Sequence, residues 1–273
     1  AGFCWKCRTL AVPNKIKMSN MHPVLSLLSR TDRSELCDNR MTLFAPGFGL
    51  GSVHYWDGSW DNDEDENPRQ LREIYENRDG QLEVVSAGQT DLLQQDRRQW
   101  WPHAIETLFV GARQTVWQET KSIHDDTAVD LIRCKGGGLK TGHVVVRQRL
   151  EKRPGLMIRP MPFGVHVLAT QGQYAGIHRF IGFRGGAVKV NIIKQGEAVV
   201  VEAHLLLMPE QWQELVFVVA ADERAEPAHR RCLSALQSPQ RFLDGARQRW
   251  ERFFDEQVPT LECDHALWTE LYY

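Results

Sequence analysis

Short runs of apolar residues, separated by Gly, Pro, Asp or Asn, cover the middle of the chain. The runs are about five to eleven residues long and rich in Val, Ile, Leu and Thr, which is typical of β-strands. Several alternate between polar and apolar positions, as in 106–116 and strictly in 189–192, so that one face is apolar. The expected strands are 41–45, 81–86, 105–110, 114–120, 127–133, 143–150, 164–169, 187–193, 198–208 and 214–220.

No helical pattern interrupts these strands, and helices are expected only after Asp222. Evenly spaced strands without intervening helices favour antiparallel sheets packed as a sandwich. The sequence therefore predicts a mainly β protein, with a large antiparallel β-sandwich followed by C-terminal linker helices. We divide the chain into an irregular extension at 1–35, a β-sandwich at 36–221 and helices at 222–273.

The first strong helical pattern begins at Ser238, which is a good N-cap, with Pro239 at the first helical position. Apolar residues then recur with helical spacing until Pro259, which ends the helix. They form one broad face: Phe242, Leu243, Ala246, Trp250, Phe253 and Phe254.

A second helix is expected from about Asp264, with Leu267 above Leu271 and Trp268 above Tyr272 at i,i+4 spacing. It barely turns twice before the sequence ends, and a helix this apolar needs a partner to bury it. We therefore expect the last residue to be a cut inside a larger architecture. The residues expected to contact a helical domain are Trp250, Phe253, Phe254, Trp268 and Tyr272.

The composition is that of an ordinary globular protein, with 273 residues, 42% hydrophobic and 25% charged. A formal net charge of −2 favours neither nucleic acid nor an anionic membrane as a partner. No apolar run approaches the roughly 18–20 residues of a membrane-spanning helix.

The first 17 residues lack the apolar centre of a signal peptide, and either Met18 or Met21 could be the true start. Cys4 and Cys7 form a C-x-x-C without the second pair of ligands that a structural zinc site needs. We expect reduced thiols, a cytoplasmic location and no cofactor.

Several segments resemble the N-terminal part of glycoside hydrolases in which a β-supersandwich precedes an (α/α)₆ barrel. This group includes glucoamylase-like enzymes, the family of processing α-glucosidase I and mannosylglycerate hydrolase, and the disaccharide phosphorylases. The resemblance covers roughly 40–273. It rests on Trp100-Trp101-Pro102 before two strands, on 125–129, on 250–261 and on 267–273.

The resemblance implies that this chain is the sandwich and the first helices of a barrel. In these enzymes the general acid and general base are carboxylates on barrel loops, so no catalytic residue is transferred to this sequence. The complete enzyme would hydrolyse a glycosidic bond with inversion. We therefore expect the 273 residues alone to be inactive.

Aromatic residues near two loops are the candidates for contact with a carbohydrate, because indole rings stack on the C–H faces of sugars. They are Tyr55, Trp56, Trp60, Trp100 and Trp101, although burial is the commoner role of such residues. The acidic loop 57–66 lacks the Gly and the Glu of an EF-hand, so whether it binds calcium stays open.

Other chemistry finds little support in the sequence. No two histidines have H-x-x-x-H or H-x-H spacing, and we predict no metal site. The glycines at 136–138 resemble a hairpin turn more than a phosphate loop, since a strand follows them.

Three functions are compatible with these patterns. The leading one is a non-catalytic sandwich that braces a helical barrel and lends a loop to the substrate cleft. The second is a stand-alone carbohydrate-binding sandwich. The third is a subunit whose helical tail docks on a separate helical chain.

Overall fold

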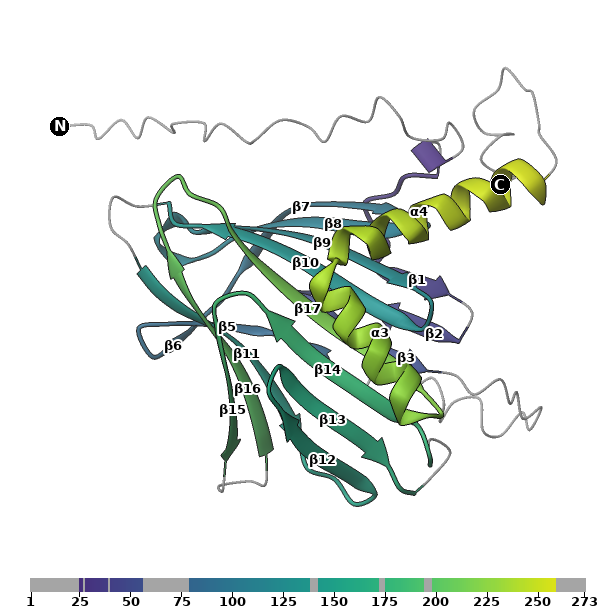
Figure 1. The fold of residues 1–273 in the computed structure, drawn as a ribbon. Helices are drawn as coiled ribbons and strands as arrows, with labels where there is room; N and C mark the ends of the chain where they lie inside the picture. Colours follow the sequence, from purple (N-terminus) through teal and green to yellow (C-terminus); the bar gives the residue numbers. More distant parts are fainter. Residues whose placement is uncertain are drawn as a thin grey trace.

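The computed structural model describes residues 25–26, 28–38, 40–55, 79–137, 142–171, 175–193 and 198–258. These residues form three antiparallel sheets followed by helices α3 (Ala225–Gln237) and α4 (Pro239–Glu256). The prediction of a mainly β protein with helices after Asp222 is therefore confirmed (Figure 1).

The largest sheet has eight strands in the order β12-β13-β14-β17-β10-β9-β8-β7. Its strands are β7 (Gln94–Trp101), β8 (Ala104–Val110), β9 (Val116–His124), β10 (Thr127–Lys135), β12 (Leu156–Met161), β13 (Gly164–Ala169), β14 (His178–Arg184) and β17 (Gln213–Asp222). The 3₁₀ turn Ala112–Gln114 joins β8 to β9.

Two smaller sheets face it. The five-stranded sheet, in the order β15-β16-β11-β5-β6, consists of β5 (Glu83–Ser86), β6 (Gln89–Asp91), β11 (Gly142–Glu151), β15 (Ala187–Ile193) and β16 (Ala198–Leu207). The four-stranded sheet consists of β1 (Glu35–Asp38), β2 (Met41–Phe44), β3 (Gly49–Tyr55) and β4 (Gly80–Gln81), in that order. One continuous hydrophobic core lies between these sheets and the inner face of the large one.

The long apolar run of β17 reflects burial on both faces of the large sheet. Leu215, Phe217 and Val219 point into the core between the sheets, whereas Val216 and Val218 point outward beneath α3. Strands buried on both faces read as continuous apolar runs rather than as alternating ones. The outer face is completed by Ala228, Cys232, Ala235 and Leu236 of α3.

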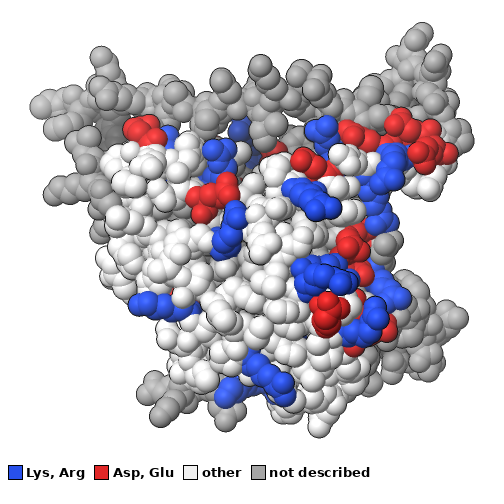
Figure 2. All heavy atoms as spheres, in the orientation of Figure 1, with Lys and Arg blue, Asp and Glu red and all other residues white. Residues whose placement is uncertain are grey.

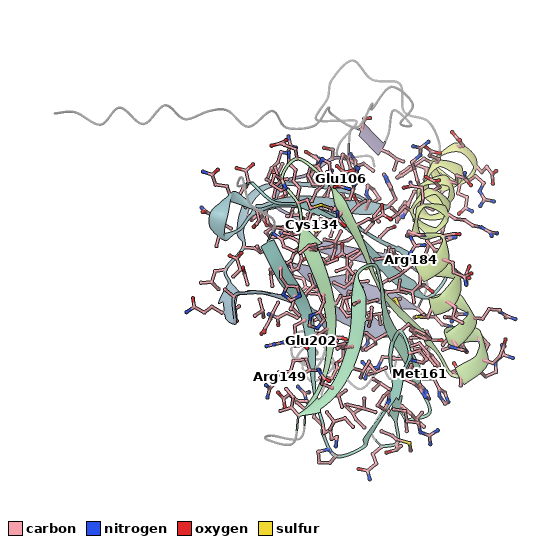
Figure 3. The ribbon with its side chains drawn as sticks, turned by 60° about the vertical axis from the view of Figure 1, so that its left-hand side comes forward. Glu106, Cys134, Arg149, Met161, Arg184 and Glu202 are labelled. Carbon is pink, nitrogen blue, oxygen red and sulfur yellow. The ribbon has the colours of Figure 1, made fainter. Side chains whose placement is uncertain are left out.

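The helices cover the outer face of the large sheet on the side opposite the smaller sheets (Figure 1). Arg184 of β14 is labelled in Figure 3. Its guanidinium donates a hydrogen bond to the carbonyl of Gln237, the last residue of α3, at 2.9 Å. Helix α4 crosses close to β9 at Gly245, where a Cβ would lie 2.8 Å from the ring of His124. The outward surfaces of α3 and α4 carry both signs of charge (Figure 2).

Some strands are not expected from the sequence. The segment PGFGLG resembles a loop, but Gly49–Tyr55 forms β3, which begins with an irregular register at Gly49 and Gly51. Gly51 has a φ of 65°, and a Cβ there would lie 2.2 Å from the carbonyl oxygen of Phe44. Strand β7 is also absent from the expected strands, because its polar residues lie on an edge of the sheet.

Among the described residues, none of the helices has the length and apolar character needed to cross a bilayer.

Candidate functional site

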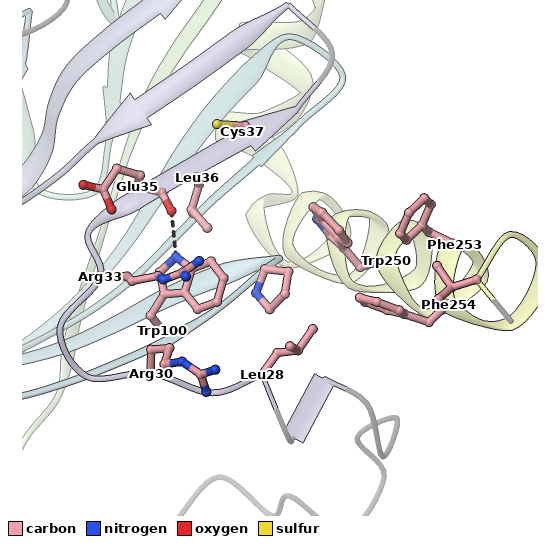
Figure 4. A pocket seen from close by; sticks show the side chains of 12 residues that line it. Leu28, Arg30, Arg33, Glu35, Leu36, Cys37, Trp100, Trp250, Phe253 and Phe254 are labelled. Atoms are coloured by element: carbon pink, nitrogen blue, oxygen red, sulfur yellow. Dashed lines mark hydrogen bonds between the residues drawn. The ribbon is translucent and has the colours of Figure 1, made fainter. Parts of the chain in front are cut away.

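A groove of about 670 Å³ lies where β1, the end of β7 and α4 meet (Figure 4). One wall is made by α4, the opposite wall by Trp100 and Pro102, and the rest by β1 and the residues before it. The lining residues are Leu28, Arg30, Arg33, Glu35, Leu36, Cys37, Trp100, Pro102, Trp250, Phe253, Phe254 and Val258. Its volume is within the range of sites that hold a ligand or a partner's side chains.

The α4 wall is a cluster of three aromatic rings. Trp250 lies 5.6 Å from Phe253 and 5.9 Å from Phe254, measured between ring centroids, and the two phenyl rings are 5.3 Å apart. Earlier in the same helix, Leu243 and Ala246 are buried. The cluster therefore continues the apolar face of α4 beyond the sheet, and Phe253 remains 38% exposed.

The opposite wall is held rigidly by backbone and indole contacts. Trp100 pairs with Arg30 through two backbone hydrogen bonds, of 3.0 and 2.7 Å. The indole N–H of Trp100 donates to the carbonyl of Glu35 at 2.6 Å, and the guanidinium of Arg33 lies 5.1 Å from the ring centroid. One face of this indole is thus occupied by a cation, which contributes a cation–π contact.

A buried carboxylate joins α4 to β1. Asp38, at the end of β1, forms an ion pair with Arg249 of α4. Its other oxygen accepts the backbone N–H of Asp125 at 2.9 Å, in the turn between β9 and β10. Asp38 therefore fixes α4 relative to β1 and to the turn between β9 and β10.

The described lining of the groove lacks the carboxyl pair of a glycosidase. Among the described residues that line it, Glu35 is the one carboxylate. Its side chain accepts the backbone N–H of Ser34 at 3.1 Å. A glycosidase needs two carboxyl groups facing the same bond. The described lining offers no such pair.

The structure separates the residues predicted to contact a carbohydrate. Trp100 lines the groove, whereas Trp101 and Tyr55 are buried. The hydroxyl of Tyr55 accepts a hydrogen bond from Arg40 at 3.1 Å, and burial raises its pKa. Trp56 and Trp60, like the acidic loop 57–66, lie outside the described residues. Carbohydrate contact stays a prediction.

The predicted contact residues for a helical domain divide in the same way. Trp250, Phe253 and Phe254 all line the groove, so the structure brings them beside Trp100. Trp268 and Tyr272 lie outside the described residues. The contribution of Arg30 and Arg33 is not foreseen, because nothing in the sequence places the segment before β1 beside β7.

His103, between β7 and β8, is a buried histidine with a lowered pKa. It is 8% exposed, and its Nδ1 has no hydrogen-bond partner among the described residues. Burial, together with the positive charge of Arg247, lowers its pKa to about 4. Its ring lies 6.1 Å from that of Trp101.

A second group of charged residues lies inside the sandwich, out of contact with solvent. Lys121 forms an ion pair of 2.8 Å with Glu119, and both side chains are fully buried. Lys121 also donates to the carbonyl of Gly47 at 2.6 Å, and Glu119 accepts the N–H of Gly49 at 2.6 Å. These contacts hold the turn between β2 and β3 against the large sheet.

Asp130 lies on the next strand, directly opposite Lys121 in the register of β9 and β10. Burial and the neighbouring Glu119 raise the pKa of Asp130 well above its usual range. Since these side chains are closed off from solvent, we assign them to the fold rather than to a ligand site.

The comparisons with known proteins give weak likenesses. No family model matches the chain, and no curated protein matches its sequence. Among solved structures, the chain is similar to a protein from the human microbiome described as a kojibiose phosphorylase. The TM-score is 0.43 at 9% identity, over 64% of this chain and 27% of that one.

Two other structures give similar values. Heparan sulfate lyase HepC from Pedobacter heparinus has a TM-score of 0.40 at 13% identity, over 68% of this chain and 33% of that one. A GalM/aldose epimerase homologue from C. elegans has a TM-score of 0.39 at 8% identity, over 71% of this chain and 99% of that one. The chain spans 27–33% of the length of the first five matched structures. These values assign neither a family nor an activity.

Proposed function

We propose that this chain is the non-catalytic β-sandwich region of a glycoside hydrolase-like protein, and that its groove docks the first helix of an adjoining helical domain. The observation that carries the proposal is the position of Val258. This residue lines the groove together with Trp250, Phe253 and Phe254, so the chain leaves α4 directly at the aromatic cluster. The proposal gives the sandwich no catalytic group of its own.

The proposed occupant is the segment 264–273 of this chain. Its apolar residues, Leu267, Trp268, Leu271 and Tyr272, have the i,i+4 spacing of one helix face. Five residues separate Val258 from this segment, and a connection of that length reaches up to about 20 Å. The segment can therefore return to the groove from which it starts.

Charge complementarity also supports this occupant. Arg30 and Arg33 stand at the wall opposite α4, and Arg33 is exposed. The segment and its connection carry Glu262, Asp264 and Glu270. An apolar helix face flanked by acidic residues matches an aromatic groove flanked by arginines.

Cys37 is a natural probe of this docking, because it lines the groove and is exposed. Burial raises the pKa of Cys134 to about 12 and raises that of Cys232 as well, so these two thiols serve as unreactive internal controls. Alkylation of each cysteine can be followed separately by peptide mass spectrometry.

We expect Trp268→Ala combined with Tyr272→Ala, or truncation after Val258, to speed alkylation of Cys37 at least tenfold. Thr269→Ala, on the other side of the expected helix, is the matched control and should keep the slow rate. Equal rates in all four proteins would show that the segment does not cover the groove. The controls Cys134 and Cys232 report any general loss of structure.

A carbohydrate in the groove is the second candidate, favoured by the two tryptophans, Trp100 and Trp250, that line it together with Arg30 and Glu35. It makes a different prediction in the same assay. A soluble oligosaccharide would slow the alkylation of Cys37 in the truncated chain, whereas under helix docking alone it would have no effect.

A further inference from the structure

Two imidazole rings lie side by side on the outer face of the five-stranded sheet. β11 and β16 are antiparallel, with Val145 opposite His204, so His143 lies diagonally across from His204. The Nε2 atom of His143 and the Nδ1 atom of His204 are 3.3 Å apart, and the ring centroids are 5.3 Å apart. His143 is exposed, so the pair is open to solvent.

The distance between the two nitrogens matches that between two imidazole ligands of one tetrahedral zinc ion. A tetrahedral zinc ion binds imidazole nitrogen at about 2.0–2.1 Å, which places two such nitrogens about 3.3 Å apart. The pair as it stands, without movement of either strand, therefore has the separation that a shared ion requires. In the absence of an ion the same two nitrogens can share a proton.

A carboxylate lies near the other ring nitrogen of His204. Its Nε2 faces the carboxylate of Glu202 at 3.6 Å, on the same face of β16. A carboxylate on that side favours the tautomer with the proton on Nε2, and this leaves the lone pair of Nδ1 directed at His143. Carboxylates commonly play this role behind metal-binding histidines.

Glu202 is itself held in place by other residues. Arg147 donates to one carboxylate oxygen from Nε at 3.0 Å and from Nη2 at 2.8 Å. Asn191 of β15 donates to the other oxygen at 3.2 Å. The supporting residues thus come from β11, β15 and β16, and Glu202 is labelled on this sheet in Figure 3.

We propose that His143 and His204 form a binding site for a tetrahedral divalent metal ion such as zinc, with Glu202 beside His204. The two remaining coordination sites of the ion would be filled by water or by donor atoms of a ligand. Among the described residues, no group of three or more His, Cys, Asp or Glu could hold a metal ion. The proposed site therefore has two protein ligands, both histidines. It is independent of the groove and of the function proposed for it.

A second histidine pair provides a matched contrast. Nε2 of His166 and Nδ1 of His178 are 2.9 Å apart, a distance that suits a hydrogen bond better than a tetrahedral ion. The ring of His166 stacks on Phe180 with centroids 4.4 Å apart. Of the two pairs, His143 and His204 have the wider spacing and the carboxylate behind them.

The test is calorimetric titration of the full chain with zinc chloride, in a Cys4→Ser, Cys7→Ser background that removes the C-x-x-C thiols. We expect one zinc ion per chain. His143→Asn and His204→Asn should each weaken binding at least tenfold, and Glu202→Gln should weaken it about tenfold or more. His178→Asn is the control and should bind as the parent does.

Parent-like binding by both His143→Asn and His204→Asn would overturn the proposal, and so would loss of binding in His178→Asn.

Discussion

Lys121 is among the largest side chains that the sandwich buries completely, and its charge is matched inside the core. Its ammonium group contacts Glu119 and the carbonyl of Gly47. Taking two charges out of water costs several kcal/mol per ion, which close pairing offsets only in part. The main effect of the cluster is therefore to fix the position of the β2–β3 turn against the large sheet.

Replacing Lys121 by Met should destabilise the protein by about 3–5 kcal/mol, because Glu119 would be left buried without its cation. Adding Glu119→Gln should recover at least about 1 kcal/mol, since the amide oxygen of the introduced glutamine can still accept the N–H of Gly49. Urea denaturation of the two variants measures both values. A double variant as unstable as the single one would contradict the account.

His103 predicts a loss of stability in acid. Its pKa is about 4 in the folded chain and about 6.5 when unfolded, so between these values the unfolded chain binds a proton that the folded chain refuses. The free energy of unfolding is unaffected by His103 above pH 6.5. It falls as the pH drops below that value, by up to about 3 kcal/mol at pH 4.

His103→Gln removes the titrating group and should flatten this part of the stability curve. The measurement is the free energy of unfolding from denaturant titrations at pH 7.5, 6, 5 and 4. An unchanged slope in the variant would show that other groups cause the acid sensitivity.

At the scale of elements, α4 depends on one buried contact as well as on its apolar face. Asp38 joins β1 to α4 through Arg249 and joins β1 to the β9–β10 turn through the N–H of Asp125. The side chain of Asp38 is 4% exposed, whereas that of Arg249 is 40% exposed. Losing the carboxylate therefore leaves a cation that water can still solvate.

Asp38→Asn should loosen the end of α4 more than it lowers global stability. We expect the amides of residues 250–256 to exchange with deuterium at least tenfold faster, with a global cost of about 1–2 kcal/mol. The control is Arg230→Gln on α3, whose partner Glu226 is 73% exposed and contributes about 0.3–0.5 kcal/mol. Unchanged exchange in α4 would assign its position to apolar packing alone.

The elements that the sequence predicts best are those with a buried face. The apolar run of β17 and the alternation of β15 both correspond to observed strands. Six observed strands are not among the expected ones: β1, β3, β6, β7, β12 and β14. Three have separate reasons: glycines in β3, a polar edge position for β7, and a proline on the opposite edge for β12. Strand β14 is missed although its residues 180–183 are buried. Edge strands keep polar residues and proline because they have a neighbour on one side only.

The sites depend on contacts that spacing along the chain does not reveal. The α4 wall of the groove is predictable, because Trp250, Phe253 and Phe254 share one helix face. The other wall arises from the pairing of Arg30 with Trp100, and the two histidines of the proposed metal site are 61 positions apart. Searches for H-x-H or H-x-x-x-H find ligands on one element, whereas this pair spans two strands.

For the whole molecule, the order of strands has a consequence for synthesis. β17 is the last strand of the described chain, yet it lies in the interior of the large sheet between β14 and β10. Until it emerges from the ribosome, the β7–β10 and β12–β14 segments each present an open edge to other nascent chains. Completion of the sheet therefore waits for β17, which ends at Asp222, and these edges stay open until that strand has been synthesised.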